Sequence, residues 1–328
     1  MKLRSLALLT LLLICSGRVA TAGEPLGLNE DEWPTVGVAD RPMVTLPTET
    51  LPFSDDVSTS AMGAVDPDGL HEVYWTVDVD DALDALASRW GMLRRDLVRL
   101  NPQLRGQDRV AAGVRLRVYE YDAQLPTQSV GSPNNGRLRH GLPMPEGPYW
   151  TLRERRTRAF GARNAVLAMV AAFNRYGESF DDAPPVSVGE LSYRRGGRAL
   201  PHRSHRTGRD VDLGYVLTPG SEGKYWKRAN VDNFDVEKNW VLIQSLVETG
   251  EVQQIFISSR LQRLLRPLAR EQLSDEEFAR YFWVTGGGED QSPILRHWDG
   301  HRDHMHVRFR CEDGNSRCRS RSVHRHSA

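Results

Sequence analysis

Residues 201–212 read PHRSHRTGRDVD, and residues 300–307 read GHRDHMHV. Five of the ten histidines of the chain lie in these two short windows, and two aspartates close the first of them. A high local density of imidazole and carboxylate groups is typical of sites that bind a divalent transition metal. Each window also runs into a segment of β-strand character. The two windows therefore predict a metal site assembled from two strands that lie far apart in the chain.

The alternation of side chains along a strand predicts which of these groups share a face. Side chains at positions i and i+2 point to the same side of a strand. His304 and His306 should therefore face one way, and the apolar residues between and after them should face the other. Asp210 and Asp212 should likewise share a face of their own strand.

A turn between the first histidines and their strand would complete the set of ligands. Gly208 offers such a turn and would let His205 approach Asp212. With His306 they would supply three protein ligands, and three ligands with a fourth position left for water are the pattern of catalytic zinc sites. His301 lies just before the second strand, where a turn could fold it back toward the same place. The alternative is a chance cluster of histidines, which predicts no metal in the purified protein.

The spacing of these residues resembles that of a known group of enzymes. Asp212 follows His205 by seven positions, and one residue separates His304 from His306. This His-x6-Asp and His-x-His signature is similar to that of the zinc peptidases grouped with lysostaphin, D-Ala-D-Ala peptidases and hedgehog domains. Within that group the two windows look like those of the penicillin-insensitive murein endopeptidases.

The resemblance extends beyond the two windows. The phrases VGSPNNGRL at residues 130–138 and RRGG at residues 194–197 are also similar to that family, so the likeness covers roughly residues 125–312. It implies a murein endopeptidase that hydrolyses the peptide cross-link between D-Ala and meso-diaminopimelate through a water activated by Zn2+. Two alternatives stay open: a D,D- or L,D-carboxypeptidase that trims stem peptides, and a non-catalytic cell-wall-binding protein with a structural metal site.

The resemblance also implies roles for single residues. The implied zinc ligands are His205, Asp212 and His306. The implied catalytic residues are His304, His301 and His202. The first of these would deprotonate the water or steady the oxyanion, and the other two would orient water, substrate or ligands.

Three neighbouring residues complete the predicted site. Asp210 could hold a ligand histidine in one tautomer, and Asp303 is a second candidate for this role. Trp298 is either a wall of the cleft or a core residue. The sequence contains no His-Glu-x-x-His motif, so the glutamate base of the helical zinc peptidases is not visible in it.

The beginning of the chain predicts export. Residues 1–22 combine a basic start, a short apolar core and an Ala-x-Ala site, which is typical of a secretory signal cut after Ala22. The core is too short for a transmembrane segment. Lipid attachment at Cys15 is disfavoured because the preceding residue, Ile14, is large. The 328-residue chain has no net charge and gives no argument for nucleic acid as a partner, so we expect a periplasmic or secreted protein that acts on peptidoglycan.

Two cysteines remain after the signal is removed. Cys311 and Cys318 should form a disulfide, as an even pair in an exported protein. The closed loop would fasten the chain just after the strand of His304 and His306. A pair of thiolate ligands is the alternative, and the absence of a Cys-x2-Cys spacing argues against it.

Composition divides the rest of the chain into four segments. Residues 23–70 hold ten acidic residues and one arginine and predict a disordered acidic linker. Residues 71–121 predict a small βααβ domain that resembles a LysM module, and the resemblance implies binding to the glycan strands of peptidoglycan. A scaffold domain without a ligand is the alternative. Residues 122–318 form the predicted zinc peptidase domain, and residues 319–328 form a basic disordered tail.

The predicted elements define an α+β fold. The βααβ domain should contain a helix capped by Asp80 and a second helix that ends at Asn101. In the peptidase domain we expect an amphipathic helix over residues 160–176, a strand over residues 252–257 and a helix opened by the capping box that starts at Ser274. Strands and helices thus alternate irregularly along the chain, and this order favours an antiparallel sheet.

Overall fold

The computed structural model describes residues 70–153, 156–221, 223, 226–285 and 291–320. The predicted signal peptide, the acidic linker up to residue 69 and the tail from residue 321 lie outside these ranges. Among the helices of the described ranges, none has the length and apolar character needed to cross a membrane.

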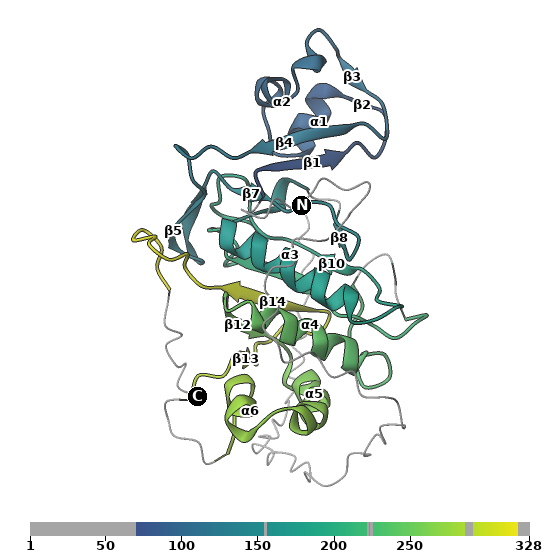
Figure 1. The fold of residues 1–328 in the computed structure, drawn as a ribbon, viewed down its shortest axis with the longest axis vertical. Coiled ribbons are helices and arrows are strands. Elements are labelled where there is room, and N and C mark those ends of the chain that lie inside the picture. The colour runs from purple at the N-terminus through teal and green to yellow at the C-terminus, as the bar shows by residue number, and fades with distance from the viewer. Residues whose placement is uncertain (1–69, 154–155, 222, 224–225, 286–290, 321–328) are drawn as a thin grey trace, which may run out of the picture. The chain divides into compact units, whose positions relative to one another are not determined.

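A six-stranded sheet forms the centre of the larger domain, the one predicted to be the peptidase (Figure 1). Its strands are β8 (Trp150–Leu152), β10 (Val186–Val188), β11 (Asp210–Gly214), β12 (Val252–Phe256), β13 (Leu295–Arg296) and β14 (His304–Phe309). They lie in the order β13-β12-β14-β11-β10-β8. The predicted antiparallel pairing is confirmed for the three inner pairs and is wrong for the outer pairs β8–β10 and β12–β13, which are parallel. In both outer pairs a helix-containing connection returns the chain to the same end of the sheet.

The register of β11 and β14 brings the two histidine windows together. Asp212 lies directly opposite His306, and Gly214 lies opposite His304. The residues that alternate with them are fully buried in the hydrophobic core: Val211, Leu213, Met305 and Val307. The predicted division into a polar face and a core face is therefore confirmed for both strands.

Helices α3 (Arg163–Glu178) and α4 (Val236–Glu248) pack side by side and run across the sheet (Figure 1). The helix predicted from residue 160 begins at Arg163 because the preceding residues form strand β9 (Phe160–Gly161), which pairs with β7 (Leu142–Pro143). A short 3-10 turn, η2 (Arg156–Arg158), comes before β9.

Two further helices follow β12. They are α5 (Ser259–Gln272) and α6 (Asp275–Tyr281). The predicted capping box of α6 is confirmed, since the Ser274 side chain accepts a hydrogen bond from Glu277 N and the Glu277 carboxylate accepts one from Ser274 N. The box satisfies backbone donors that would otherwise be unpaired at the start of the helix.

The βααβ order of the smaller domain is also observed. It consists of β1 (Glu72–Thr76), β2 (Asp81–Ala82), α1 (Leu83–Arg89), α2 (Arg94–Leu100), the 3-10 turn η1 (Pro102–Leu104), β3 (Arg109–Val110) and β4 (Arg115–Glu120). β1 pairs with β4, and β2 pairs with β3, both antiparallel. The predicted cap is wrong: α1 starts after Ala82, because β2 intervenes, and Asp80 instead accepts a hydrogen bond from Ala112 N at 2.8 Å.

Aromatic contacts join this small domain to the segment that follows it. Trp75 Nε1 donates to Met144 O at 3.0 Å, and the Trp75 ring meets Phe160 edge-on. Between them the chain forms the hairpin of β5 (Gln128–Ser132) and β6 (Asn135–Arg139). The apolar residues of both regions belong to one continuous core.

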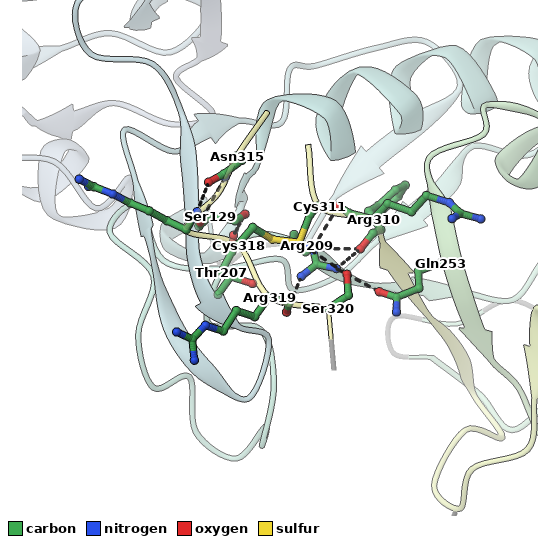
Figure 2. Close-up of a disulfide and its surroundings, with 12 residues drawn as sticks. Ser129, Thr207, Arg209, Gln253, Arg310, Cys311, Asn315, Cys318, Arg319 and Ser320 are labelled. Carbon is green, nitrogen blue, oxygen red and sulfur yellow. Dashed lines mark hydrogen bonds between the residues drawn. A yellow bond between two sulfur atoms is a disulfide. The ribbon is translucent and has the colours of Figure 1, made fainter. Parts of the chain in front are cut away.

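The predicted disulfide is confirmed, and it closes a loop that docks on β5 (Figure 2). Between Cys311 and Cys318 the loop carries Asn315, whose side-chain nitrogen donates to Ser129 O at 3.1 Å. Ser129 Oγ in turn donates to Thr207 O at 2.7 Å, just before β11. The loop therefore fastens the end of β14, the hairpin and the start of β11 to one another.

Arg209 is the buried anchor of this arrangement. Its guanidinium is fully buried and donates to three carbonyl oxygens, those of Phe309, Arg310 and Arg319, as well as to Gln253 Oε1 (Figure 2). Burial lowers the pKa of Arg209 to about 10, so the side chain stays charged at neutral pH. Because Arg209 precedes Asp210, these bonds also fix the start of the strand that carries the polar face.

We expect the double substitution Cys311→Ser/Cys318→Ser to lower the free energy of unfolding by about 2–3 kcal/mol, as loop closure predicts for so short a ring. Denaturant unfolding of the full chain measures the change. The wild-type protein in reductant should match the variant. Equal unfolding free energies for the variant and the oxidised wild type would mean that Arg209 and Asn315 hold the loop without the disulfide.

Candidate metal centre

Four histidine rings gather around one carboxylate and form what we call the histidine cluster: His202, His205, His304, His306 and Asp212. The closest approach is from His306 Nδ1 to Asp212 Oδ1, at 2.9 Å. His205 Nε2 lies 3.3 Å from the same oxygen and 3.2 Å from His306 Nδ1. His202 Nδ1 and His304 Nε2 lie slightly farther from the carboxylate, at 3.6 and 3.8 Å. Residues about a hundred positions apart in the chain therefore meet at one point.

The three shortest separations between the nitrogen and oxygen atoms of the cluster have the size that a tetrahedrally coordinated metal ion requires. With metal–ligand distances of about 2.0–2.1 Å, the corners of a tetrahedron are roughly 3.3 Å apart. The mutual distances of His205 Nε2, His306 Nδ1 and Asp212 Oδ1 are 3.2, 3.3 and 2.9 Å. His202 belongs to an overlapping group, since one ligand atom each of His202, His205 and Asp212 lies within 4.8 Å of the others. The donor set and its spacing fit a zinc ion.

The rings closest to the carboxylate have their outer nitrogens hydrogen bonded away from the centre. His205 Nδ1 lies 2.8 Å from Leu191 O, so that nitrogen donates and Nε2 turns inward. His306 Nε2 lies 3.1 Å from Asp210 Oδ1. Partners of this kind fix the ring orientation and raise the basicity of the inner nitrogen. The contact predicted for Asp210 is therefore present.

The other two rings follow the same pattern. His304 Nδ1 lies 2.7 Å from Asp303 Oδ1, so the second predicted contact is also present. His202 Nε2 is hydrogen bonded to the Glu190 carboxylate. Each inner nitrogen of the cluster thus faces Asp212, and each outer nitrogen has an oxygen partner. An arrangement of this kind is suited to a cation at the centre.

The backbone before β11 brings His205 into place. His205 has a φ of 62° and Gly208 a φ of 73°, both in the left-handed region. A histidine in this region is uncommon and is held there by its surroundings. The bond from His205 N to Asp210 Oδ2, at 3.0 Å, supplies part of that support. The turn predicted at Gly208 therefore extends back to His205 itself.

Charges in the cluster are strongly coupled. Although burial opposes ionisation, Arg308 and His306 hold the pKa of Asp210 well below its usual range. His205 and His306 do the same for the pKa of Asp212, which is also buried. Despite its own burial, hydrogen bonds with both carboxylates raise the pKa of His306 to about 9. A metal ion that binds at Nδ1 of His306 must therefore displace a proton.

His301 lies at the edge of the cluster. Its ring centroid is 5.0 Å from that of His304 and 5.9 Å from that of His306. Burial and these neighbouring rings lower its pKa to about 4, so it is neutral at pH 7. Trp298 is half exposed and lies edge-on to Phe256, which excludes the alternative that Trp298 is a core residue.

Trp226 is a site residue that the sequence did not single out. Its indole stacks on the His304 ring with the centroids 5.2 Å apart, and Arg153 lies over the same indole. Its Nε1 donates to Ser187 Oγ at 2.8 Å. A Cβ atom at Gly214 would come within 2.4 Å of the indole, so a larger residue there would displace the Trp226 ring from this position.

Glu190 is the second residue that the sequence did not single out. It bonds His202 on one side and Arg158 Nη1 at 2.9 Å on the other. Although burial opposes ionisation, the bond to His202 and the charge of Arg158 lower the pKa of Glu190. Glu190 lies in a loop and belongs to no motif, so no spacing in the sequence could have predicted it.

An α+β domain with this donor set around one carboxylate defines a candidate metal-dependent hydrolase. The family model for penicillin-insensitive murein endopeptidases matches residues 129–327, and the chain belongs to that family. Proteins named penicillin-insensitive murein endopeptidase are among its relatives in Klebsiella pneumoniae, Yersinia enterocolitica and Pectobacterium atrosepticum. They are 28%, 26% and 28% identical over 207, 212 and 211 residues, which cover 58–60% of this chain and 69% of each relative.

Proposed function

We propose that the protein is a zinc-dependent endopeptidase that hydrolyses peptide cross-links of peptidoglycan, at the bond between D-Ala and meso-diaminopimelate. The observation that carries this proposal is the triangle formed by His205, Asp212 and His306, whose edges match a tetrahedral zinc ion. Family membership supports the reaction and the polymer. The predicted signal peptide and the disulfide agree with an exported enzyme.

In this proposal the triangle holds the ion and leaves one position for water. A bound zinc ion supplies a Lewis acid that polarises the scissile carbonyl and lowers the pKa of a water molecule. Leu191 O and Asp210 bind the outer nitrogens of His205 and His306, and this holds their inner nitrogens toward the ion. Asp212 is buried, so its negative charge is shielded from solvent.

His304 is proposed as the group that moves the proton. Its Nε2 lies 3.8 Å from Asp212 Oδ1, close enough to accept a proton from a water molecule beside the ligands. Asp303 accepts the hydrogen bond of Nδ1 and would stabilise the imidazolium that forms. The stack on Trp226 holds the ring in that orientation. His301, neutral at pH 7, and His202 are proposed to orient water and substrate.

Digestion of purified sacculi tests the proposal. The expected result is conversion of cross-linked dimers to monomers, lost in chelator and restored by zinc. Loss of a terminal D-Ala alone would instead establish the carboxypeptidase. Zinc bound tightly without any turnover would establish a wall-binding protein with a structural metal. The LysM-like domain, which we propose to bind glycan strands, is tested separately by binding of N-acetylglucosamine oligomers.

The substitution Glu190→Gln should lower turnover by about 10–100-fold at unchanged zinc affinity, because it removes the carboxylate that orients His202, which is proposed to position water and substrate. Competition with a chromogenic chelator measures the affinity. Glu248→Gln is the matched control, since Glu248 pairs with Arg175 away from the cluster. A folded Glu190→Gln variant that loses zinc affinity would instead assign His202 to the ion.

A further inference from the structure

A large basic cavity lies where the small βααβ domain meets the β5–β6 hairpin and the loop at residues 193–197. Its volume is about 1440 Å³, and its walls come from α2, the end of β4, the β5–β6 hairpin and the loop at residues 193–197. Five of the lining residues are arginines: Arg99, Arg137, Arg139, Arg194 and Arg195. Three are acidic: Asp96, Glu120 and Asp122. The lining therefore carries an excess of positive charge, which favours an anionic ligand.

The arginines of this basic cavity have no ion-pair partner within the described part of the chain. Arg194 is the informative one, because its Nη1 is buried and has no hydrogen-bond partner there. Burial lowers the pKa of Arg194, and the charge of Asp96, which lies beyond ion-pair distance, offsets only part of this effect. A buried polar nitrogen without a protein partner is rare and calls for a water, an ion or a ligand as its partner. A carboxylate is the usual partner of a guanidinium, which it meets with two parallel hydrogen bonds.

The basic cavity is connected to the histidine cluster through its own wall. Gly197 N donates to Arg206 O at 3.0 Å, next to His205. Leu138 N donates to Arg195 O at 3.3 Å, which ties the same loop to the hairpin. A side chain at Gly196 would come within 2.2 Å of Arg206 O, so the loop lies against that segment. A polymer that occupies the cavity would therefore be held close to the segment that carries His205.

We propose that the basic cavity binds the carboxylate-bearing peptide stems of peptidoglycan, as a substrate-binding site separate from the metal centre. This inference rests on the proposed function, because it takes the substrate to be that polymer. Stem peptides carry free carboxylates, whereas the sugar backbone between them offers hydroxyl and amide groups. The arginines would recognise the stems, and the metal centre would cut a cross-link nearby.

The experiment measures binding without cleavage. Fluorescence anisotropy is recorded with the full chain in chelator, for labelled soluble murein fragments that carry their peptide stems and for labelled N-acetylglucosamine oligomers, which carry no stem and no carboxylate. The variant Arg139→Gln/Arg195→Gln removes two exposed arginines of the cavity. The matched control, Arg260→Gln/Arg263→Gln, removes two exposed arginines of α5. Similar unfolding midpoints for both variants exclude a folding defect.

The cavity variant should bind stem-bearing fragments about tenfold or more weakly, since charged hydrogen bonds are lost, while the control stays near wild type. The N-acetylglucosamine oligomers should bind all three proteins alike. Wild-type affinity in the cavity variant, equal weakening by both variants, or a loss that persists on the N-acetylglucosamine oligomers would overturn the inference. A wild-type protein that binds stems but releases no monomers from sacculi would instead contradict the proposed function alone.

Discussion

Replacement of His306 by alanine is expected to remove zinc and hydrolysis together. His306 supplies one corner of the triangle and is bonded to both Asp210 and Asp212. Without it, Asp210 and Asp212 lose the histidine that they share, and the triangle keeps only one histidine, His205. Metal analysis of the purified variant should find no stoichiometric zinc, and the turnover of cross-linked muropeptides should fall about 10³-fold or more.

His297→Ala is the control for this variant. His297 is half exposed and pairs with Asp299 outside the cluster, so zinc content and turnover should stay at wild-type levels. Because His306 is buried, the unfolding of His306→Ala must be measured beside its metal content. A folded His306→Ala protein with full zinc occupancy would refute the ligand role, and His202 would then be the next candidate.

The polar face of the site could be predicted because it depends on local periodicity. A strand repeats every two residues, so His304 and His306 had to share a face wherever the strand was placed. The disulfide followed from a count of the cysteines of an exported chain. These predictions needed no knowledge of which strands are neighbours.

The residues that escaped prediction depend on tertiary contacts alone. Trp226 reaches His304 from a loop far away in the chain, and Glu190 reaches His202 from the end of the short strand β10. Neither pair has a characteristic spacing. The parallel outer strands escaped for the same reason, since pairing at the edge of a sheet is decided by where the connecting helices pack. Asp80 failed as a cap because a nearby backbone amide competes for its carboxylate.

Replacement of His304 by alanine separates the reaction from the ion. His304 lies 3.8 Å from Asp212 Oδ1, outside the triangle, so zinc should stay bound at wild-type stoichiometry. Turnover should fall by roughly 10²–10⁴-fold, the usual loss when a general acid–base is removed. Steady-state kinetics on a purified cross-linked dimer should place the loss in kcat, because His304 acts on the water and its removal leaves the rest of the substrate site in place.

Two outcomes would contradict this assignment in different ways. Unchanged turnover would mean that another group carries the proton, with His301 as the nearest alternative, since its ring centroid lies 5.0 Å from that of His304. Loss of zinc as complete as in His306→Ala would mean that His304 is a ligand. Asp303→Asn provides the graded comparison: it keeps the ring and its stack on Trp226 but removes the charge behind Nδ1, so we expect a smaller loss of kcat than in His304→Ala and no loss of zinc.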